Sequence, residues 1–140
     1  MRLFNNIAGL GYIAFTLTKL RERKRKIQQY KEEGRNEEER EVIAETAHFW
    51  SEKIIKHFQV DIEVKNPENL PEKGPVVYVS NHQSYADILT LLNVVKHQVG
   101  FIAKEELQKI PVFSKWILRI RSLFIIRGDT RESLKTISEG

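Results

Sequence analysis

The sequence predicts an α/β fold, with helices around a mostly parallel sheet, preceded by a separate helical segment at the N-terminus. Runs of apolar residues with the two-residue period of strands alternate along the chain with runs that have the period of helices, and this alternation indicates the α/β class. An uncharged stretch followed by clustered basic residues indicates the separate segment. The chain has 140 residues, which is a usual size for one domain.

The N-terminal segment has the features of a membrane anchor. Residues Leu3 to Leu17 are uncharged and mostly apolar, and their spacing predicts a weakly amphipathic helix. Such a helix would rise about 23 Å, less than the roughly 30 Å hydrocarbon core of a bilayer, so we expect it to insert into one leaflet. A basic cluster follows that would contact anionic headgroups: Lys19, Arg21, Arg23, Lys24, Arg25 and Lys26. We therefore assign residues 1–36 to a membrane-anchoring helix and a basic linker.

The rest of the chain alternates between the two periods. Apolar side chains recur every three or four positions over residues 38–58 and predict a helix, while residues 27–40 fit either a helix or a solvated connection. Alternation at 60–64 and an apolar run at 75–80 predict two strands that flank a turn. The remaining elements are expected in this order: helix 88–95, strand 99–103, helix 113–120, strand 123–126 and helix 131–138.

The sharpest chemical feature is the segment Asn81-His82-Gln83-Ser84-Tyr85-Ala86-Asp87, which joins an expected strand to an expected helix. Loops at the carboxyl ends of strands hold the ligand sites of open α/β sheets. A neutral imidazole can take a proton from an alcohol, and a nearby carboxylate fixes its tautomer. His82 and Asp87 can meet if one lies in the loop and the other at the helix start. Spacing alone also allows Asp87 to be a helix cap and His82 an ordinary loop histidine.

Several other chemistries lack the residues that they need. The chain has no cysteine, which excludes a disulfide, a thiolate nucleophile and a cysteine-based zinc site. No His-Glu-x-x-His pair occurs, and His48, His57 and His97 have no carboxylate at a comparable spacing, so no metal is expected. There is no Gly-x-Ser-x-Gly elbow for a serine nucleophile. The basic cluster has no interleaved aromatic platform, which disfavours nucleic acid as a partner.

The segment from Asn81 to Asp87 resembles the His, any four, Asp signature of the glycerolipid acyltransferases, particularly the 1-acylglycerol-3-phosphate acyltransferases. Two later segments resemble further blocks of that family in the same order: Ala103 to Leu107 followed by Pro111, and Phe124 to Arg127. We therefore interpret residues 37–140 as the N-terminal part of an acyltransferase domain. The family's third block, Phe-Pro-Glu-Gly-x-Arg, does not occur, so the domain is expected to be truncated at its C-terminus. Arg121 stands where the family more often has glycine, and Ser114 stands near a usual glycine of the family.

The resemblance implies an O-acyltransferase of phospholipid biosynthesis at the cytoplasmic face of a membrane. It implies transfer of a fatty acyl group from acyl-CoA or acyl-carrier protein to the free hydroxyl of 1-acylglycerol-3-phosphate (lysophosphatidic acid), giving phosphatidic acid without a cofactor. His82 would be the general base and Asp87 its orienter. Arg127, Lys104 and Asn81 would bind substrate, with the Arg127 guanidinium on the phosphate. The alternative is a catalytically incomplete membrane-peripheral binding module.

Overall fold

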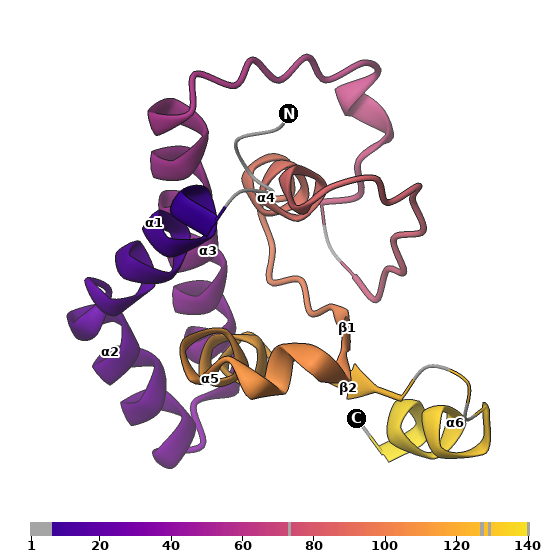
Figure 1. The fold of residues 1–140 in the computed structure, drawn as a ribbon. Helices are drawn as coiled ribbons and strands as arrows, with labels where there is room; N and C mark the ends of the chain where they lie inside the picture. The colour runs from indigo at the N-terminus through magenta and orange to yellow at the C-terminus, as the bar shows by residue number, and fades with distance from the viewer. Residues whose placement is uncertain (1–6, 73, 127, 129, 140) are drawn as a thin grey trace. The chain divides into compact units, whose positions relative to one another are not determined.

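The computed structural model describes residues 7–72, 74–126, 128 and 130–139. The chain divides into two compact units, residues 1–98 and residues 99–140, and Figure 1 shows the ribbon of both. The first unit is helical in its described part, and the second contains a small parallel sheet. The expected α/β class is confirmed in this coarser form, as a mostly helical chain with a two-stranded sheet.

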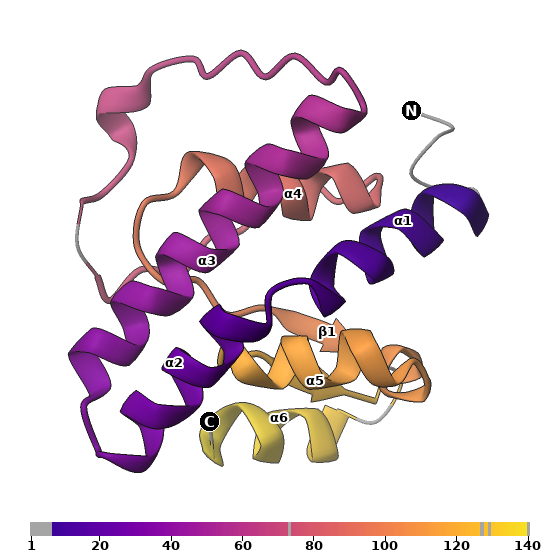
Figure 2. The same cartoon turned by 90° about the vertical axis from the view of Figure 1, so that its left-hand side faces the viewer.

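Helices build the first unit. Its elements are, in chain order, α1 (Ile7–Thr18), α2 (Arg21–Glu32), α3 (Asn36–His57), the 3-10 helix η2 (Pro67–Asn69) and α4 (Tyr85–Val94). Helix α3 packs against both α2 and α4 (Figure 1, Figure 2). Ile54 of α3 is fully buried, and Ile27 of α2 and Ile43 of α3 are almost completely buried. Burial of each such side chain stabilises a fold by roughly 1.5–3 kcal/mol, which makes α3 the central helix of this unit.

Charge and backbone conformation explain where α3 begins and ends. Three glutamates occupy its first turn and Lys56 lies in its last turn, which complements the helix dipole. Gly34, with φ +70°, provides the left-handed turn between α2 and α3. The helix expected over residues 38–58 is confirmed. The stretch 27–40, for which the sequence allowed two interpretations, contains the end of α2, this turn and the start of α3.

Two side-chain contacts join α1 to α3. The Trp50 Nε1–H donates a hydrogen bond to Thr16 Oγ1 at 2.9 Å, and the ring of Tyr12 stacks on that of His57 with centroids 3.8 Å apart. Helix α1 corresponds to the helix expected over residues 3–17, of which residues 3–6 lie outside the described residues. Among the described helices, none combines the length and the apolar character needed to cross a bilayer.

The second unit contains the sheet. Its elements are β1 (Ile102–Lys104), the 3-10 helix η3 (Glu105–Lys109), α5 (Pro111–Arg119), β2 (Leu123–Ile125) and α6 (Thr130–Glu139). Strands β1 and β2 are parallel, with Ile102 opposite Leu123 in the register. The Ser122 hydroxyl accepts the Phe101 N–H at 2.8 Å and extends the pairing beyond the strand end. These strands and helices confirm the order expected after residue 98.

Two expected strands are wrong. Residues 60–64 and 75–80 lie in segments without helix or strand, because a strand requires a partner for its backbone hydrogen bonds and neither segment has one among the described residues. The alternation of apolar side chains predicts extended backbone but cannot show that a partner strand lies beside it. The sheet is therefore smaller than expected. The division into an anchor, residues 1–36, and a catalytic part, residues 37–140, stays a prediction, as does the expected truncation.

Candidate functional site

Helix α4 begins where the sequence provides a cap. Ser84 has an extended backbone, and its Oγ accepts the N–H of Ala86 at 2.9 Å. In return, the carboxylate of Asp87 in the first turn accepts the Ser84 N–H at 2.9 Å. This reciprocal arrangement is a capping box, which satisfies backbone donors that a helix start would otherwise leave unpaired. It explains why α4 starts at Tyr85, three residues before the expected start.

The same carboxylate brings His82 and Asp87 together. Asp87 Oδ2 accepts the Gln83 N–H at 2.6 Å and lies 3.1 Å from His82 Nδ1. Because an ionised carboxylate can only accept hydrogen bonds, the imidazole nitrogen that faces it must carry a proton. The neutral ring then has its lone pair on Nε2, and Nε2 has no hydrogen-bond partner among the described residues. Such a nitrogen is available to accept a proton from a bound alcohol.

Hydrogen bonds keep the Asp87 carboxylate charged. The Ser84 backbone N–H lowers the pKa of Asp87 most, burial of the carboxyl opposes this, and the Gln83 N–H and His82 lower the pKa further. The side chains of His82 and Asp87 are 56% and 37% exposed, so the pair is open to solvent. At neutral pH the site is thus an accessible imidazole held by a fixed negative charge.

The other predicted site residues are placed as follows. Asn81 is exposed and directly precedes His82. Lys104 is exposed at the end of β1, and this strand belongs to the second unit. Arg127 lies outside the described residues. Of the predicted site residues that the structure describes, His82 and Asp87 are in contact.

Asp87 has two roles at the start of α4, as a helix cap and as the partner of His82. Serine three residues before an acidic residue is a signal for a capping box, and Ser84 could have been identified by it. The spacing in the sequence allows the cap and the imidazole contact as alternatives for Asp87, and in the structure one oxygen makes both. Within the part of the chain that the structure describes, no three His, Asp or Glu side chains gather as a metal site would require.

Comparison with known proteins identifies the family of the chain. Residues 61–139, more than half of the chain, match the model of the family described as Acyltransferase. The chain belongs to the acyltransferase family. The matched region of this acyltransferase contains both His82 and Asp87.

Curated relatives of the acyltransferase carry related names. The chain is 28% identical over 97 residues to the 1-acyl-sn-glycerol-3-phosphate acyltransferase of Escherichia coli. The aligned residues are 69% of the chain and 39% of that protein. It is 36% identical over 76 residues, 54% of the chain and 28% of the relative, to the lyso-ornithine lipid O-acyltransferase of Brucella abortus. It is 43% identical over 67 residues, 47% of the chain and 18% of the relative, to the chloroplastic 1-acyl-sn-glycerol-3-phosphate acyltransferase LPAT1 of Arabidopsis thaliana.

These matches confirm the resemblance noted from the motifs. The chain spans well under half the length of these three curated relatives. No solved structure matches it.

Proposed function

We propose that this acyltransferase transfers a fatty acyl group from the thioester of acyl-CoA or acyl-carrier protein to the free hydroxyl of 1-acylglycerol-3-phosphate, giving phosphatidic acid. The observation that carries the proposal is the 3.1 Å contact between His82 Nδ1 and Asp87 Oδ2. Family membership and the names of the relatives support the reaction class. The acceptor follows the relatives that are named for 1-acylglycerol-3-phosphate.

The proposed reaction needs one proton acceptor and no covalent enzyme intermediate. His82 Nε2 takes the proton of the lipid hydroxyl as its oxygen attacks the thioester carbonyl carbon, and Asp87 stabilises the imidazolium that forms. The tetrahedral intermediate then collapses, the carbon–sulfur bond breaks, and the leaving thiolate takes the proton from Nε2. The products are phosphatidic acid and the free thiol of the donor, and His82 returns to its neutral form. The absence of a Gly-x-Ser-x-Gly elbow from the sequence agrees with direct transfer.

Positive side chains would hold the phosphate of the acceptor. We assign this role first to Arg127, because a guanidinium forms paired hydrogen bonds with phosphate oxygens. Lys104 would add positive charge near a phosphate or the acyl donor, and Asn81 would contact the substrate beside His82. Each of these roles is carried from the family's motifs and stays a proposal.

A thioester assay tests the proposed reaction. The purified chain is incubated with 1-acylglycerol-3-phosphate and a long-chain acyl-CoA, or the matching acyl-carrier protein, and release of free thiol is measured. His82→Gln should lower kcat by about 10²- to 10⁴-fold, the usual contribution of a general base. His57→Gln is the matched control, since His57 is exposed and its ring stacks on Tyr12, with no salt bridge to a described residue.

Near-normal turnover by His82→Gln would refute the role of this histidine. A wild-type chain that binds 1-acylglycerol-3-phosphate vesicles and consumes no thioester with either donor would favour the alternative, a binding module that lacks catalysis. The assay therefore separates the two functions that the sequence allowed.

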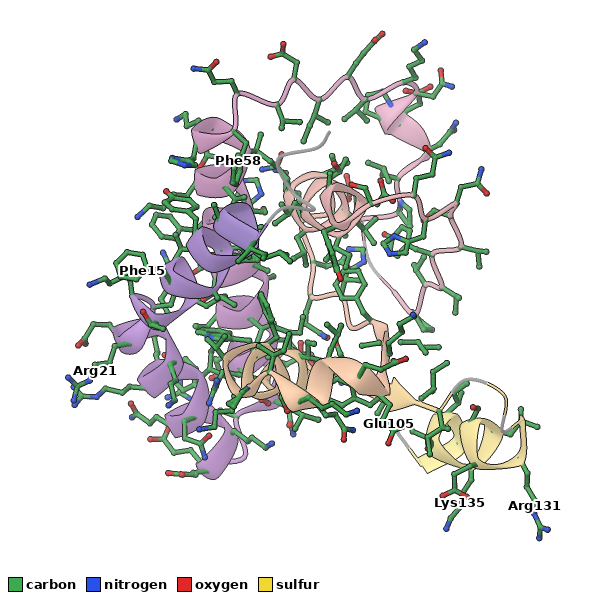
Figure 3. The ribbon with its side chains drawn as sticks, in the orientation of Figure 1. Phe15, Arg21, Phe58, Glu105, Arg131 and Lys135 are labelled. Atoms are coloured by element: carbon green, nitrogen blue, oxygen red, sulfur yellow. The ribbon has the colours of Figure 1, made fainter. Side chains whose placement is uncertain are left out.

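We also propose that the enzyme works at an anionic membrane surface on the cytoplasmic side, held there by α1 and the basic cluster. Ile7 and Phe15 of α1 are exposed apolar side chains, and α2 carries most of the basic cluster. Figure 3 shows Phe15 and Arg21 projecting outward from α1 and α2, on the side away from α4. Apolar insertion and attraction of about 1 kcal/mol per basic residue near the surface act together in such an arrangement.

Vesicle binding tests the membrane proposal. Arg21 and Lys24 are exposed members of the basic cluster, and neither forms a salt bridge with a described residue. The double variant Arg21→Glu/Lys24→Glu should lower partitioning onto vesicles with 30 mol% phosphatidylglycerol by at least about tenfold. Lys53→Glu/Lys65→Glu changes the net charge equally at exposed lysines outside the cluster and should lose much less. Equal loss in both variants would contradict a role specific to the basic cluster.

A further inference from the structure

The segment that leads to His82 is largely exposed. Every residue from Gly74 to Gln83 is exposed except Tyr78, which is half-buried. The neighbouring Val77 and Val79 are 87% and 91% exposed. We call residues 74–81 the approach segment. Among the described residues no backbone hydrogen bond joins the approach segment to another part of the chain, so its side chains must fix its course.

Tyr78 contacts His97, which follows α4 in the chain. The phenol oxygen of Tyr78 lies 3.2 Å from His97 Nε2, and the two rings stack with centroids 5.9 Å apart and planes inclined by 25°. Tyr78 precedes α4 and His97 follows it, so the contact joins the chain segments before and after the helix that carries Asp87. Within the described residues this is the single side-chain hydrogen bond made by the approach segment.

We infer that Tyr78 and His97 form a positioning pair, which holds the approach segment so that the His82 ring stays against Asp87. The catalytic consequence of this pair rests on the proposed function. Asp87 is fixed by the capping box, and the Gln83 N–H bound to it holds the chain on the C-terminal side of His82. On the N-terminal side the chain is exposed up to Tyr78, four residues before His82. Four extended residues span about 13 Å, and without an anchor at Tyr78 that length of chain would sample many more conformations. Loss of the pair should therefore change the position of His82 and leave that of Asp87 unchanged.

The contact between Tyr78 and His97 does not depend on one charge state. A neutral His97 with its proton on Nδ1 accepts the phenol O–H at Nε2, and an imidazolium donates its Nε2–H to the phenol oxygen. The stacked rings remain in contact in both states. The pair is thus suited to a constant positioning role.

Three substitutions separate the hydrogen bond from the bulk of the side chains. Tyr78→Phe keeps the ring and removes the hydroxyl, and His97→Leu removes the partner nitrogen. His97→Gln is the conservative variant, because its amide oxygen can still accept from the phenol. Tyr30→Phe removes a hydroxyl from a half-buried tyrosine of α2 and is the matched control.

The main measurement is the tautomer of His82, read from the ¹⁵N shifts of its imidazole nitrogens in the full chain. Wild type should show the proton mainly on Nδ1, facing Asp87. Tyr78→Phe and His97→Leu should move the shifts toward a mixture of tautomers, and kcat in the thioester assay should fall about three- to tenfold with KM unchanged. His97→Gln and Tyr30→Phe should resemble wild type in both readouts.

The outcomes distinguish the positioning pair from the proposed reaction. Unchanged His82 shifts in both Tyr78→Phe and His97→Leu would overturn the pair, whatever the assay shows. Changed shifts in a chain that consumes no thioester would support the pair and refute the proposed function. If Tyr78→Phe lowers the unfolding temperature, the His82 shifts are compared at a temperature where His97→Leu and His97→Gln are both folded, and equal shifts in these two variants would overturn the pair.

Discussion

The oxygen of Asp87 that lies 3.1 Å from the Nδ1 of His82 is the same Oδ2 that caps helix α4. The cap positions the carboxylate through two backbone N–H groups, independently of the imidazole. A functional side chain held in this way needs little reorganisation when substrate arrives. Substitution of the carboxylate should therefore affect catalysis and stability to different extents, and substitution of the cap should affect mainly stability.

Replacing the carboxylate by an amide should reduce catalysis more than stability. In Asp87→Asn the side-chain oxygen can still accept a backbone N–H, so we expect a loss of roughly 0.5–1 kcal/mol in the free energy of unfolding, at the low end for a cap. The amide carries no charge to stabilise the imidazolium of His82, so kcat should fall about 10²- to 10⁴-fold. Thioester turnover and urea unfolding measure the two effects.

Asp61→Asn is the matched control, because Asp61 is exposed and forms no salt bridge with a described residue. It should leave both turnover and unfolding within error of wild type. Turnover of Asp87→Asn equal to that of Asp61→Asn would contradict the orienting role of Asp87.

The Asp87 cap should also make stability depend on pH. Hydrogen bonds lower the pKa of Asp87 below its ordinary value of 3.8 in the folded state. A lowered folded-state pKa means that the unfolded chain binds the proton first as pH falls, so this contribution is present above the ordinary value and is lost as pH falls through the folded-state pKa. The difference in unfolding free energy between wild type and Asp87→Asn should therefore be constant near neutral pH and shrink below pH 3.8. Urea unfolding across that range measures it, and a difference that grows on acidification would show the opposite sign.

Removal of the cap hydroxyl should destabilise α4. Ser84→Ala leaves the Ala86 N–H without its acceptor, which typically costs about 1 kcal/mol. Ser84→Thr retains the hydroxyl and should recover most of this loss. Ser80→Ala, in the exposed approach segment, is the control and should have little effect. Chemical denaturation of the three variants tests the cap, and equal losses in Ser80→Ala and Ser84→Ala would argue against it.

The sequence predicted the helices better than the sheet because helical hydrogen bonds are local. The period of apolar residues predicts α3 to within two residues, and the Ser84 cap explains why α4 starts three residues before its expected start. A strand depends on a partner that can lie anywhere in the chain, which is why the alternation at residues 60–64 failed. In the second unit β1 and β2 provide each other with such a partner, and there the expected strands formed.

The candidate site shows the same distinction. The contact between His82 and Asp87 spans five residues and could be anticipated from the motif. The contact between Tyr78 and His97 spans nineteen residues and has no sequence signal, because it depends on how the chain passes around α4. Local chemistry could thus be predicted from the residues, while the contacts that hold it in place required the structure.

Arg121 provides a test of backbone strain in the second unit. Its φ is +59°, in the left-handed region that favours glycine, at a position where the acyltransferase resemblance also favours glycine. A Cβ on Gly100 would lie 2.4 Å from the Arg121 carbonyl oxygen, so the turn is tightly packed and has little room to relax.

The left-handed conformation costs an ordinary residue about 1–2 kcal/mol, and glycine loses roughly 0.5–1 kcal/mol more than alanine in chain entropy on folding. Arg121→Gly should therefore be more stable than Arg121→Ala by about 0.5–1 kcal/mol, measured by urea unfolding. Both variants remove the same arginine side chain with its interactions, so their difference isolates the backbone term. If Arg121→Ala proved equally stable or more stable, strain at this turn would not contribute to the stability of the second unit.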